Sequence, residues 1–501
     1  MTLLSYLDNA SITRQFSVIE WMGTIAVLTV FILSCQAIYN LYFHPLAGVP
    51  GPLLARASRL WYVHKLLRGS MAKEIHKVHE KYGKMVRIAP DELVFTEPDA
   101  WKDIYGHRAG KGEVPKDPNF YNNLSSRATS IINAPGARHG EIRRLLSYGF
   151  SEKALREQEV LVQGYCTMFL DRLDELRTLG AEIDMVKWYN FFTFDVIGDL
   201  AFGEAFGCLK SSDYHPWIIC MFRNIKATAF LRSVDYFPFL KPVKQYLVPK
   251  ELVRTRNEHR AMTVSLGMQR RNTPSDRIDF MSRMTKENGI SDEEFVASTG
   301  TLVIAGSETT ATLLSGLTHQ LLMNPKVLKT LTNEVRTAFA AEEDINFIEV
   351  GKLKYLMACL EEALRFYPAA PEAFPRRTKV GEEFYGQWVP AETTVSVYHY
   401  AAYHSTEHFF LADQFIPERW LGDERFKNDH KNMMQPFSFG PRNCLGKNLA
   451  IVEMRLVLSR LIYRYDLEIE PGHQDWDNQR TWLLWEKGPL RVKLTPAKAA
   501  Q

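Results

Sequence analysis

One long apolar stretch stands near the N-terminus of this chain. Residues 21–43 contain no charged side chain and exceed the roughly 20 residues that a helix needs to cross a bilayer. Trp21, Tyr39 and Tyr42 lie near its ends, where the aromatic side chains of membrane anchors collect. A cleaved signal peptide would instead have a basic start, a shorter apolar run and a small-residue cleavage site. The pattern predicts one transmembrane anchor over about residues 21–43, within an N-terminal segment of residues 1–43.

The charges on either side of this stretch predict where the rest of the chain lies. Only Arg14 precedes it, whereas a series of basic residues follows: Arg56, Arg59, Lys65, Arg68 and Lys73. Because positively charged flanks stay on the cytosolic side, the large C-terminal part is expected in the cytosol. Residues 44–52 hold three prolines and two glycines, which cannot continue a helix, so a stiff hinge is expected there.

Helical periodicity dominates the chain after the hinge. Helices are expected over residues 72–83 and 153–180, and short β-strands within residues 84–98 and 394–403. No second linker, low-complexity tract or repeat interrupts the pattern up to residue 494. Residues 53–501 are therefore expected to form one domain, mainly α with small β-sheets.

The longest predicted helix has clear boundaries. Ser291 can serve as its N-cap, with Glu294 at the third helical position as the second half of a capping box. The helix is expected to end at Asn324, because Pro325 follows. At about 1.5 Å per residue, it would cross the whole domain.

The centre of this helix contains residues that cost local stability. Gly306 is less favourable than alanine by up to about 1 kcal/mol, and Glu308 and Thr309 interrupt an otherwise apolar rod. One interpretation is a kinked helix beside a solvated glutamate. The other is a ligand site, because Ala305 and Thr309 are four residues apart and share a face against which a small ligand could lie.

A second predicted helix, residues 353–368, carries a charged pair. Glu362 and Arg365 are three residues apart and can pair, and Arg419 downstream can share the same carboxylate. A solvated pair is the simpler interpretation, since exposed pairs contribute only about 0–1 kcal/mol. Because this helix is apolar over much of its surface, a buried network that fixes the loops leading to Cys444 stays open as the alternative.

Composition excludes several classes of function. The chain has 501 residues, 46% hydrophobic and 24% charged, and a formal net charge of +3, which provides no field for nucleic acid. Its six cysteines include no CxxC pair, so neither a zinc site nor a disulfide framework is predicted. A reducing compartment fits this usage.

One of these cysteines, Cys444, lies in an unusual segment, FSFGPRNCLG. A thiolate that binds a metal needs backbone donors, nearby positive charge and a cramped loop. Phe437, Gly440, Arg442 and Gly446 can supply these conditions, and the helix predicted after the loop favours a negative sulfur at its N-terminus. A buried, inert cysteine is the alternative, but this spacing occurs by chance in on the order of one chain in ten thousand.

These segments, taken in order, resemble the motifs of the cytochrome P450 family. Residues 437–446 resemble its haem-thiolate loop, 305–310 its oxygen-activating helix, 362–365 its E-x-x-R pair and 417–420 the segment whose Arg joins that pair. The resemblance covers nearly all of the chain, including the anchor and hinge of microsomal members. It implies the cytochrome P450 fold with an N-terminal transmembrane helix, a haem domain over residues 53–501, and an endoplasmic reticulum location.

The resemblance implies haem b as the cofactor, with Cys444 as the axial ligand of its iron. Further residues expected at the haem are Arg442, Arg376, Arg143, His139, Phe437, Gly446, Ala305 and Gly306. His139 stands where the family usually has Trp. A second departure is at residues 403–410, where the family more often has H-R-x-P.

The resemblance also implies roles for the polar residues of the two helices. Thr309 and Glu308 are expected to manage protons during oxygen activation, with Glu308 connecting the site to solvent. Glu362, Arg365 and Arg419 are expected to form the structural triad of the family.

Within the family, residues 194–209, 214–217 and 485–494 are similar to fungal secondary-metabolism enzymes of the isotrichodermin C-15 hydroxylase type. This similarity implies oxidation of a hydrophobic terpenoid or polyketide with O2. Electrons are expected from a separate, membrane-bound NADPH-cytochrome P450 reductase, with cytochrome b5 as an optional partner. A family-type isomerase or dehydratase and a non-catalytic haem-binding protein remain alternatives.

The substrate pocket is expected to draw on several separated segments. They are residues 121–132, the helix near Phe222, residues 303–305, the strand after residue 374 and the turn at Leu483. Most of these residues are apolar, so ordinary core packing is the competing interpretation for each one taken alone.

Overall fold

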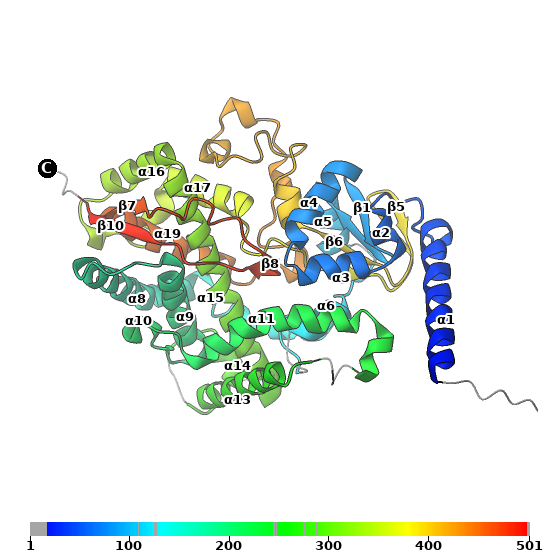
Figure 1. Cartoon of the computed structure of the whole chain (residues 1–501). Helices are drawn as coiled ribbons and strands as arrows, with labels where there is room; N and C mark the ends of the chain where they lie inside the picture. The colour runs from blue at the N-terminus through cyan, green and yellow to red at the C-terminus, as the bar shows by residue number, and fades with distance from the viewer. Residues whose placement is uncertain are drawn as a thin grey trace, which may run out of the picture.

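The structure is a computed structural model that describes residues 18–497, except residues 109, 125–127, 244–245, 247, 274–276 and 287–288. It is a mainly helical body with small sheets, which confirms the predicted fold class (Figure 1). Residues 1–17 of the predicted N-terminal segment and residues 125–127 of the predicted pocket lie outside the described residues.

The helices of the first half of the chain are α1 (Val18–Ile38), α2 (Leu53–Ala57), α3 (Leu60–Leu67), α4 (Met71–Tyr82), α5 (Pro98–Tyr105), α6 (Pro118–Leu124), α7 (Gly136–Ser147), α8 (Glu152–Thr178), α9 (Met185–Phe202), α10 (Cys208–Ser211) and α11 (Pro216–Asp235). Those of the second half are α13 (Lys250–Asn272), α14 (Ser282–Lys286), α15 (Asp292–Met323), α16 (Pro325–Ala338), α17 (Lys354–Phe366), α18 (His399–Tyr403) and α19 (Lys447–Arg464). The helices expected over residues 72–83 and 153–180 correspond to α4 and α8.

The strands form one sheet of four and three pairs. The strands are β1 (Met85–Ala89), β2 (Glu92–Phe95), β3 (Arg376–Arg377), β4 (Glu382–Phe384), β5 (Gln387–Val389), β6 (Thr394–Val397), β7 (Tyr465–Ile469), β8 (Thr481–Trp482), β9 (Leu484–Trp485) and β10 (Val492–Pro496). The larger sheet has the order β1-β2-β6-β3, with β2 and β6 parallel and the other two pairs antiparallel. The remaining pairs are β10-β7, β4-β5 and β8-β9.

The short strand expected within residues 394–403 is present, but it covers only the start of this range. β6 ends at Val397, and the aromatic residues after it form the short helix α18. The His399 and Tyr403 rings, four residues apart, stack with centroids 5.6 Å apart, and the Tyr400 and His404 rings stack at 4.0 Å. Stacking at this spacing requires a helical turn, so packing overrode the strand propensity of aromatic side chains.

The long helix α15 follows the boundaries predicted from the sequence. Ser291 accepts a hydrogen bond from the Glu294 amide, and the Glu294 side chain accepts one from the Ser291 amide, so the capping box is confirmed. The helix ends at Met323, before Asn324 and Pro325. Its 32 residues run through the middle of the helical body (Figure 1).

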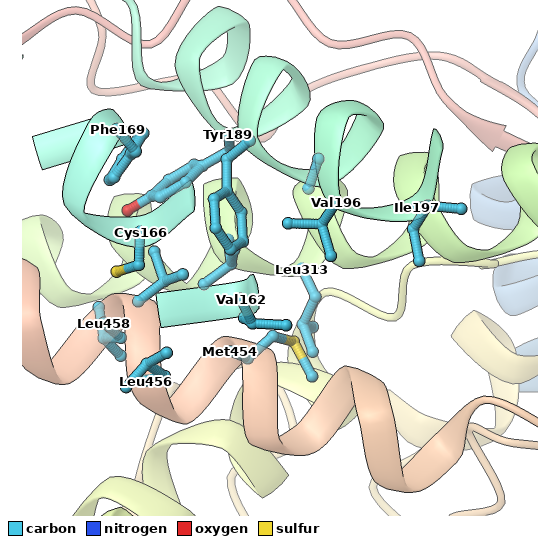
Figure 2. Close-up of a cluster of buried hydrophobic side chains, with 14 of the residues drawn as sticks. Val162, Cys166, Phe169, Tyr189, Val196, Ile197, Leu313, Met454, Leu456 and Leu458 are labelled. Carbon is cyan, nitrogen blue, oxygen red and sulfur yellow. The ribbon is translucent and has the colours of Figure 1, made fainter. Parts of the chain in front are cut away.

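The main core lies between α8, α9, α15 and α19. Figure 2 shows buried side chains from these four helices pointing toward one another. Two smaller clusters of buried apolar residues lie around the four-stranded sheet, one against α5 and one against α3 and α4. This packing holds α15 against α9 and α19. Helix α15, which carries Thr309, and helix α19, which follows the Cys444 loop, are therefore rigidly supported.

One helix among the described residues is long and apolar enough to cross a membrane. It comprises most of α1 and the π-helix Tyr39–Phe43, which together give the 24-residue span Glu20–Phe43. Its apolar 18-residue window has a mean hydropathy of 1.8 and is not buried in the protein, whereas Asn40, near the end of the span, is buried. α1 stands beside the body in Figure 1. Its length and composition fit the membrane anchor predicted from the sequence.

A buried carboxyl group lies within α19. Glu453 is 1% exposed, and its Oε1 atom has no hydrogen-bond partner among the described residues. Burial raises the pKa of Glu453 to about 8. The folded protein therefore keeps a proton at pH 7 that the unfolded chain, with a pKa near 4.5, has already released.

This difference predicts a pH dependence of stability. As pH rises from below 4.5 toward 8, the unfolded state is increasingly favoured, because only its Glu453 ionises freely. Glu453→Gln removes this titration, so at pH 8 the variant should be more stable than the wild type and should unfold at a higher temperature. The expected difference in the free energy of unfolding is a few kcal/mol, at about 1.4 kcal/mol per pKa unit. The gap should shrink at pH 5. Thermal unfolding followed by circular dichroism at both pH values tests this; a gap of equal size at both would contradict it.

Candidate active site

Cys444 lies in a tight loop between the short 3-10 helix Gly440–Arg442 and α19. Its backbone amide donates to the Phe437 carbonyl at 2.8 Å. Gly440 has a φ of +74°, and a Cβ atom there would lie 2.0 Å from the carbonyl oxygen of Tyr105 in α5. The turn therefore requires glycine at this position.

The second glycine of the loop has a weaker steric role than the sequence suggested. Gly446 has a φ of −85°, and a Cβ atom there would meet Phe150 at an ordinary contact distance of 3.6 Å. Phe437, at the start of the loop, is half-buried and receives the Lys447 ammonium 5.6 Å from its ring centroid. The tight bend around the sulfur thus depends on Gly440.

The electrostatic surroundings of Cys444 combine burial with positive charge. Desolvation raises the pKa of the thiol, and the backbone amides of Gly446 and Lys447 and the guanidinium of Arg143 act in the opposite direction. These amides belong to the N-terminal start of α19, where the helix dipole favours an anion. The side-chain surface of Cys444 nevertheless remains accessible, unlike that of the buried core cysteines. An accessible sulfur surrounded by donors suits a metal ligand.

Helix α15 leaves one face uncovered at its centre. Most of its residues are buried, yet Ala305 is exposed and Thr309, four residues later, is half-buried. At Gly306, a Cβ atom would approach the Ile197 side chain of α9 to 2.9 Å, so glycine lets the two helices pack closely. The Thr309 hydroxyl donates to the Ala305 carbonyl at 2.6 Å, which leaves the hydroxyl oxygen free to accept a hydrogen bond.

Glu308 is not solvated, so one interpretation of the sequence is wrong. Glu308 is 2% exposed, and its Oε1 atom forms an ion pair with the Lys487 ammonium. Lys487 also donates to the Thr312 hydroxyl at 2.6 Å. The Oε2 atom of Glu308 has no hydrogen-bond partner within the part of the chain that the structure describes. Lys487, the ion-pair partner of Glu308, lies next to the exposed residues Gly488 and Pro489.

Arg442 and Arg376 begin a cluster of cations near the Cys444 loop. Arg442 Nε lies 2.7 Å from Glu113 Oε2, and Arg442 Nη1 donates to the Ala134 carbonyl at 2.8 Å. Arg376 is buried, with Nη1 donating to the Val114 carbonyl at 3.1 Å. Its Nε atom has no partner among the described residues.

His139, Lys116 and Arg143 complete this cluster. Burial, assisted by Arg442 and Lys116, lowers the pKa of His139 to about 4, so its ring is neutral at pH 7. Burial and the two arginines Arg376 and Arg442 also lower the pKa of Lys116. Arg143 donates to the carbonyl and the side-chain oxygen of Asn443, at 2.7 and 2.6 Å, and so ties α7 to the loop.

The cluster contains more cationic groups than anionic ones. Four basic side chains surround Glu113, which is the anion that contacts Arg442. An unpaired buried donor such as Arg376 Nε is costly unless a further acceptor is present. Sequence reasoning singled out neither Glu113 nor Lys116, because nothing local marks them.

These features fit a haem group. A flat apolar macrocycle would cover the uncovered face at Ala305, and its iron would take the accessible Cys444 sulfur as ligand. Its two propionates would supply the acceptors that the cluster around Arg376 and Arg442 lacks. The residues present therefore match both the apolar and the charged parts of the cofactor.

The Glu362 and Arg365 side chains are both fully buried on α17. Arg365 Nη2 lies 2.7 Å from Glu362 Oε1, and Arg365 Nε lies 3.0 Å from Oε2. The other donors of Arg365 bind the backbone carbonyls of Tyr403, Ala412 and Gln414. The solvated pair considered from the sequence is therefore wrong, and the buried network is present.

Arg419 reaches the same carboxylate from the 3-10 helix Pro417–Trp420. Its Nε atom lies 3.4 Å from Glu362 Oε2, which also accepts a hydrogen bond from Trp420 Nε1 at 2.9 Å. Arg419 forms a second buried ion pair with Asp429. Asp429, which the sequence did not indicate, neutralises the second guanidinium. The two buried arginines are therefore matched by two buried carboxylates.

Three of the residues expected around a substrate, Tyr121, Phe222 and Leu483, lie on separate segments of the fold. Tyr121 is buried, with the Lys116 ammonium 4.5 Å from its ring centroid. Phe222 packs edge-on against Phe194 and Tyr214. Leu483 forms the turn between β8 and β9, with a φ of +73°.

A wide hollow of about 1390 Å³ lies beside the Cys444 loop and is lined in part by Phe437, Gly440 and Asn443. It lies between the loop, α17 and α19. Its lining includes four basic residues, Lys354, Lys431, Lys447 and Arg455, and two acidic ones, Glu152 and Glu361. This surface is concave and carries an excess of positive charge.

Comparison with known proteins gives matches along nearly the whole chain. The profile of the Cytochrome P450 family matches residues 50–494. The chain is 44% identical over 464 residues to Cytochrome P450 monooxygenase astA of Talaromyces wortmannii, covering 92% of this chain and 94% of the relative. It is 41% identical over 487 residues to Cytochrome P450 monooxygenase lcsI of Purpureocillium lilacinum, covering 95% and 94%. It is 42% identical over 467 residues to Averantin hydroxylase of Dothistroma septosporum, covering 91% and 88%.

Proposed function

The chain belongs to the cytochrome P450 family, and from this premise we propose that it oxidises a hydrophobic terpenoid or polyketide of fungal secondary metabolism. The reaction uses O2 and two electrons from NADPH, delivered by a separate reductase, with cytochrome b5 as an optional partner. The proposal rests on two features that occur together. One is the uncovered face of α15 with Ala305 and Thr309, and the other is the accessible Cys444 thiol in a loop rich in hydrogen-bond donors. The names of fungal relatives, among them a hydroxylase, support it.

Cys444 would hold the haem iron, and the cluster of Arg442, Arg376, Arg143, His139 and Lys116 would hold the haem propionates. When bound, the haem-thiolate group supplies O2 activation, and the thiolate favours cleavage of the O–O bond. Neutral His139 can donate one ring N–H to a propionate without adding charge. The helices that carry and flank Thr309 belong to the main core, so the site is held on a rigid support.

Thr309 manages the proton at its hydroxyl oxygen. Because this hydroxyl donates to the Ala305 carbonyl, its oxygen accepts a hydrogen bond from a water and holds that water beside the uncovered face. Glu308, on the adjacent buried side of α15, and Lys487 form the pair through which the site exchanges protons with the exterior. Lys487 positions the carboxylate through their ion pair.

The membrane anchor and the basic hollow set the partner and the location. The span Glu20–Phe43 holds the protein in the endoplasmic reticulum membrane, with the haem domain in the cytosol. The hollow beside the Cys444 loop accepts an acidic surface of the reductase, because its excess of lysine and arginine attracts one.

The proposal is tested by reconstitution of the full chain with purified reductase and NADPH. Apolar terpenoids and polyketides are screened for substrate-induced haem spectral shifts, and hits are incubated under ¹⁸O2. One labelled oxygen atom in the product identifies a monooxygenase. A rearranged product without label would instead assign the isomerase or dehydratase class, and NADPH consumption that no substrate stimulates would assign a non-catalytic haem-binding protein.

Thr309→Ala should leave folding and haem binding nearly intact. Alanine is a better helix former, and the lost hydroxyl bond to the Ala305 carbonyl contributes only about 1 kcal/mol. The yield of product per NADPH should fall about tenfold, with hydrogen peroxide released in its place, because protons are no longer delivered in order. NADPH consumed, peroxide released and product formed are measured together, with Thr301→Ala, on the same helix, as control. Unchanged coupling in Thr309→Ala would move the proton route elsewhere.

Lys487→Met should destabilise the protein by roughly 3 kcal/mol, because it leaves Glu308 buried without its partner. The double variant with Glu308→Gln removes both charges and should recover most of this loss. Coupling of NADPH to product should stay low in the single and the double variant, since neither retains the charged pair. Urea unfolding measures the first effect and product yield the second; a double variant with wild-type coupling would make the pair purely structural.

A further inference from the structure

A guanidinium without hydrogen bonds lies buried at the end of α11. Arg232 is 4% exposed, and no described residue accepts a hydrogen bond from its side chain. Its nearest anion is Glu372, with 4.0 Å between Arg232 Nη2 and Glu372 Oε2, which is beyond hydrogen-bond distance. The guanidinium instead lies over the Phe120 ring, 4.9 Å from its centroid. An arginine side chain carries five N–H donors, so this arrangement leaves a large unmet demand for acceptors.

The carboxyl group opposite Arg232 is incompletely bonded too. Glu372 is 2% exposed, and its Oε1 atom has no hydrogen-bond partner among the residues described. The Thr481 hydroxyl and the Leu483 backbone amide lie close to the same carboxyl and lower its pKa, against the effect of burial. Each buried polar group left unsatisfied costs about 1–3 kcal/mol. A polar ligand that enters between these groups would therefore be bound by bonds the protein leaves open.

The position of the pair connects it to the active site. Phe120, under Arg232, packs on Tyr121 with 5.0 Å between ring centroids, and Tyr121 receives the ammonium of Lys116 in the propionate cluster. On the other side, Glu372 lies four residues before Arg376 of the same cluster. At about 3.3 Å per residue, these two Cα atoms are at most about 13 Å apart. The pair is thus linked to the cluster around Arg376 and Lys116 by ring contacts on one side and by a short stretch of chain on the other.

The charge of the pair limits the kind of ligand it accepts. Arg232 and Glu372 together carry no net charge when both are ionised. The next arginine, Arg59, is neutralised by its own ion pairs with Asp91 and Glu92. Burial raises the pKa of Glu372, and Arg232 opposes this rise. An anionic ligand would meet no excess positive charge here, so the free-energy cost of removing it from water would not be offset. A neutral hydroxyl can accept a hydrogen bond from Arg232 and donate one to Glu372.

We propose that Arg232 and Glu372 form a polar anchor of the substrate pocket, which binds a neutral hydroxyl group at the end of an otherwise apolar substrate. This inference rests on the proposed function and adds a substrate class to it, namely alcohols or phenols with the hydroxyl remote from the oxidised carbon. The hydroxyl oxygen accepts an N–H from Arg232, and its proton is donated to Glu372 Oε1. The apolar remainder lies against the Phe120 ring.

The test uses the full-length holoenzyme and three probes with one C15 skeleton: farnesol, farnesene and farnesoate. Dissociation constants are measured from haem difference spectra and from the ligand-induced shift of the unfolding temperature. The wild type should bind farnesol at least about tenfold more tightly than farnesene or farnesoate, as expected for bonds to a charged group. Arg232→Met should abolish this preference, and Arg232→Lys should weaken it. Arg254→Met, which removes an exposed arginine paired with Glu251, is the matched control and should change nothing.

A change of preference separates ligand binding from a structural role. In Glu372→Gln the guanidinium loses its neutralising charge while the shape of the site is kept, so farnesoate should now bind more tightly than to the wild type. Equal binding of the three probes by the wild type, or no binding of farnesol, would overturn the proposal and leave the pair to an ordered water. Tightest binding of farnesoate by the wild type would also overturn it. The carbon monoxide spectrum of the same wild-type sample reports separately whether the proposed function fails.

Discussion

Replacing Cys444 by serine is expected to abolish the red-shifted band of the reduced, carbon monoxide-bound protein, together with all oxidation of substrate. A neutral hydroxyl is a poor ligand for iron and cannot donate electron density as a thiolate does. The loop itself should survive, because its geometry depends on the bond from the Cys444 amide to the Phe437 carbonyl and on Gly440, not on the sulfur. The expected loss of turnover is therefore complete while the fold remains.

The measurement is a difference spectrum of reduced protein with and without carbon monoxide, with haem content determined in parallel. Cys220→Ser, a buried cysteine of α11, is the matched control and should keep the band. A Cys444→Ser protein that retained the red-shifted band would show that another group is the ligand. Loss of the band in Cys220→Ser as well would indicate general disruption of the fold.

Replacing Glu362 by alanine is expected to remove most of the stability of the haem domain, about 5 kcal/mol, which is comparable to the whole stability of many domains. Glu362 accepts hydrogen bonds from Arg365, Trp420 and the backbone amide of Ile416, and lies against Arg419. Without this carboxylate, one guanidinium stays buried with carbonyl partners alone. The loops that lead to Cys444 then lose the group that joins them to α17.

The variant should express as poorly soluble protein with little bound haem, measured as haem absorbance per protein and by urea unfolding of any soluble fraction. Glu361→Ala is a close control, since Glu361 is the preceding residue on α17 and lines the hollow instead of the network. A normal haem content in Glu362→Ala would contradict the structural role of the triad. Arg365→Lys should also fail, because lysine cannot bind a carboxylate and three carbonyls in fixed directions.

The matches to fungal proteins confirm the resemblance that was found from the spacing of Cys444, Arg442 and Gly440 and from the order of the other motifs. This prediction succeeded because a metal-binding loop needs particular residue types at short, fixed separations. The apolar helix that fits a membrane anchor could be predicted in the same way, since the thickness of a bilayer sets the length of an uncharged run. The helical segments followed from local periodicity.

The sequence by itself thus determined the features that are local along the chain: the anchor helix, the capped ends of α15, the Cys444 loop and the spacing of Glu362 and Arg365. Only the tertiary structure decided which distant residues meet. It paired Glu308 with Lys487, Glu113 with Arg442 and Arg419 with Asp429, set Arg232 beside Glu372, and ended the short strand at Val397 so that His399–Tyr403 form a helix. The physical reason is that the sequence around a charged residue does not show whether its side chain is solvated or buried. Its role is fixed only when packing removes water and brings its partner within hydrogen-bond distance.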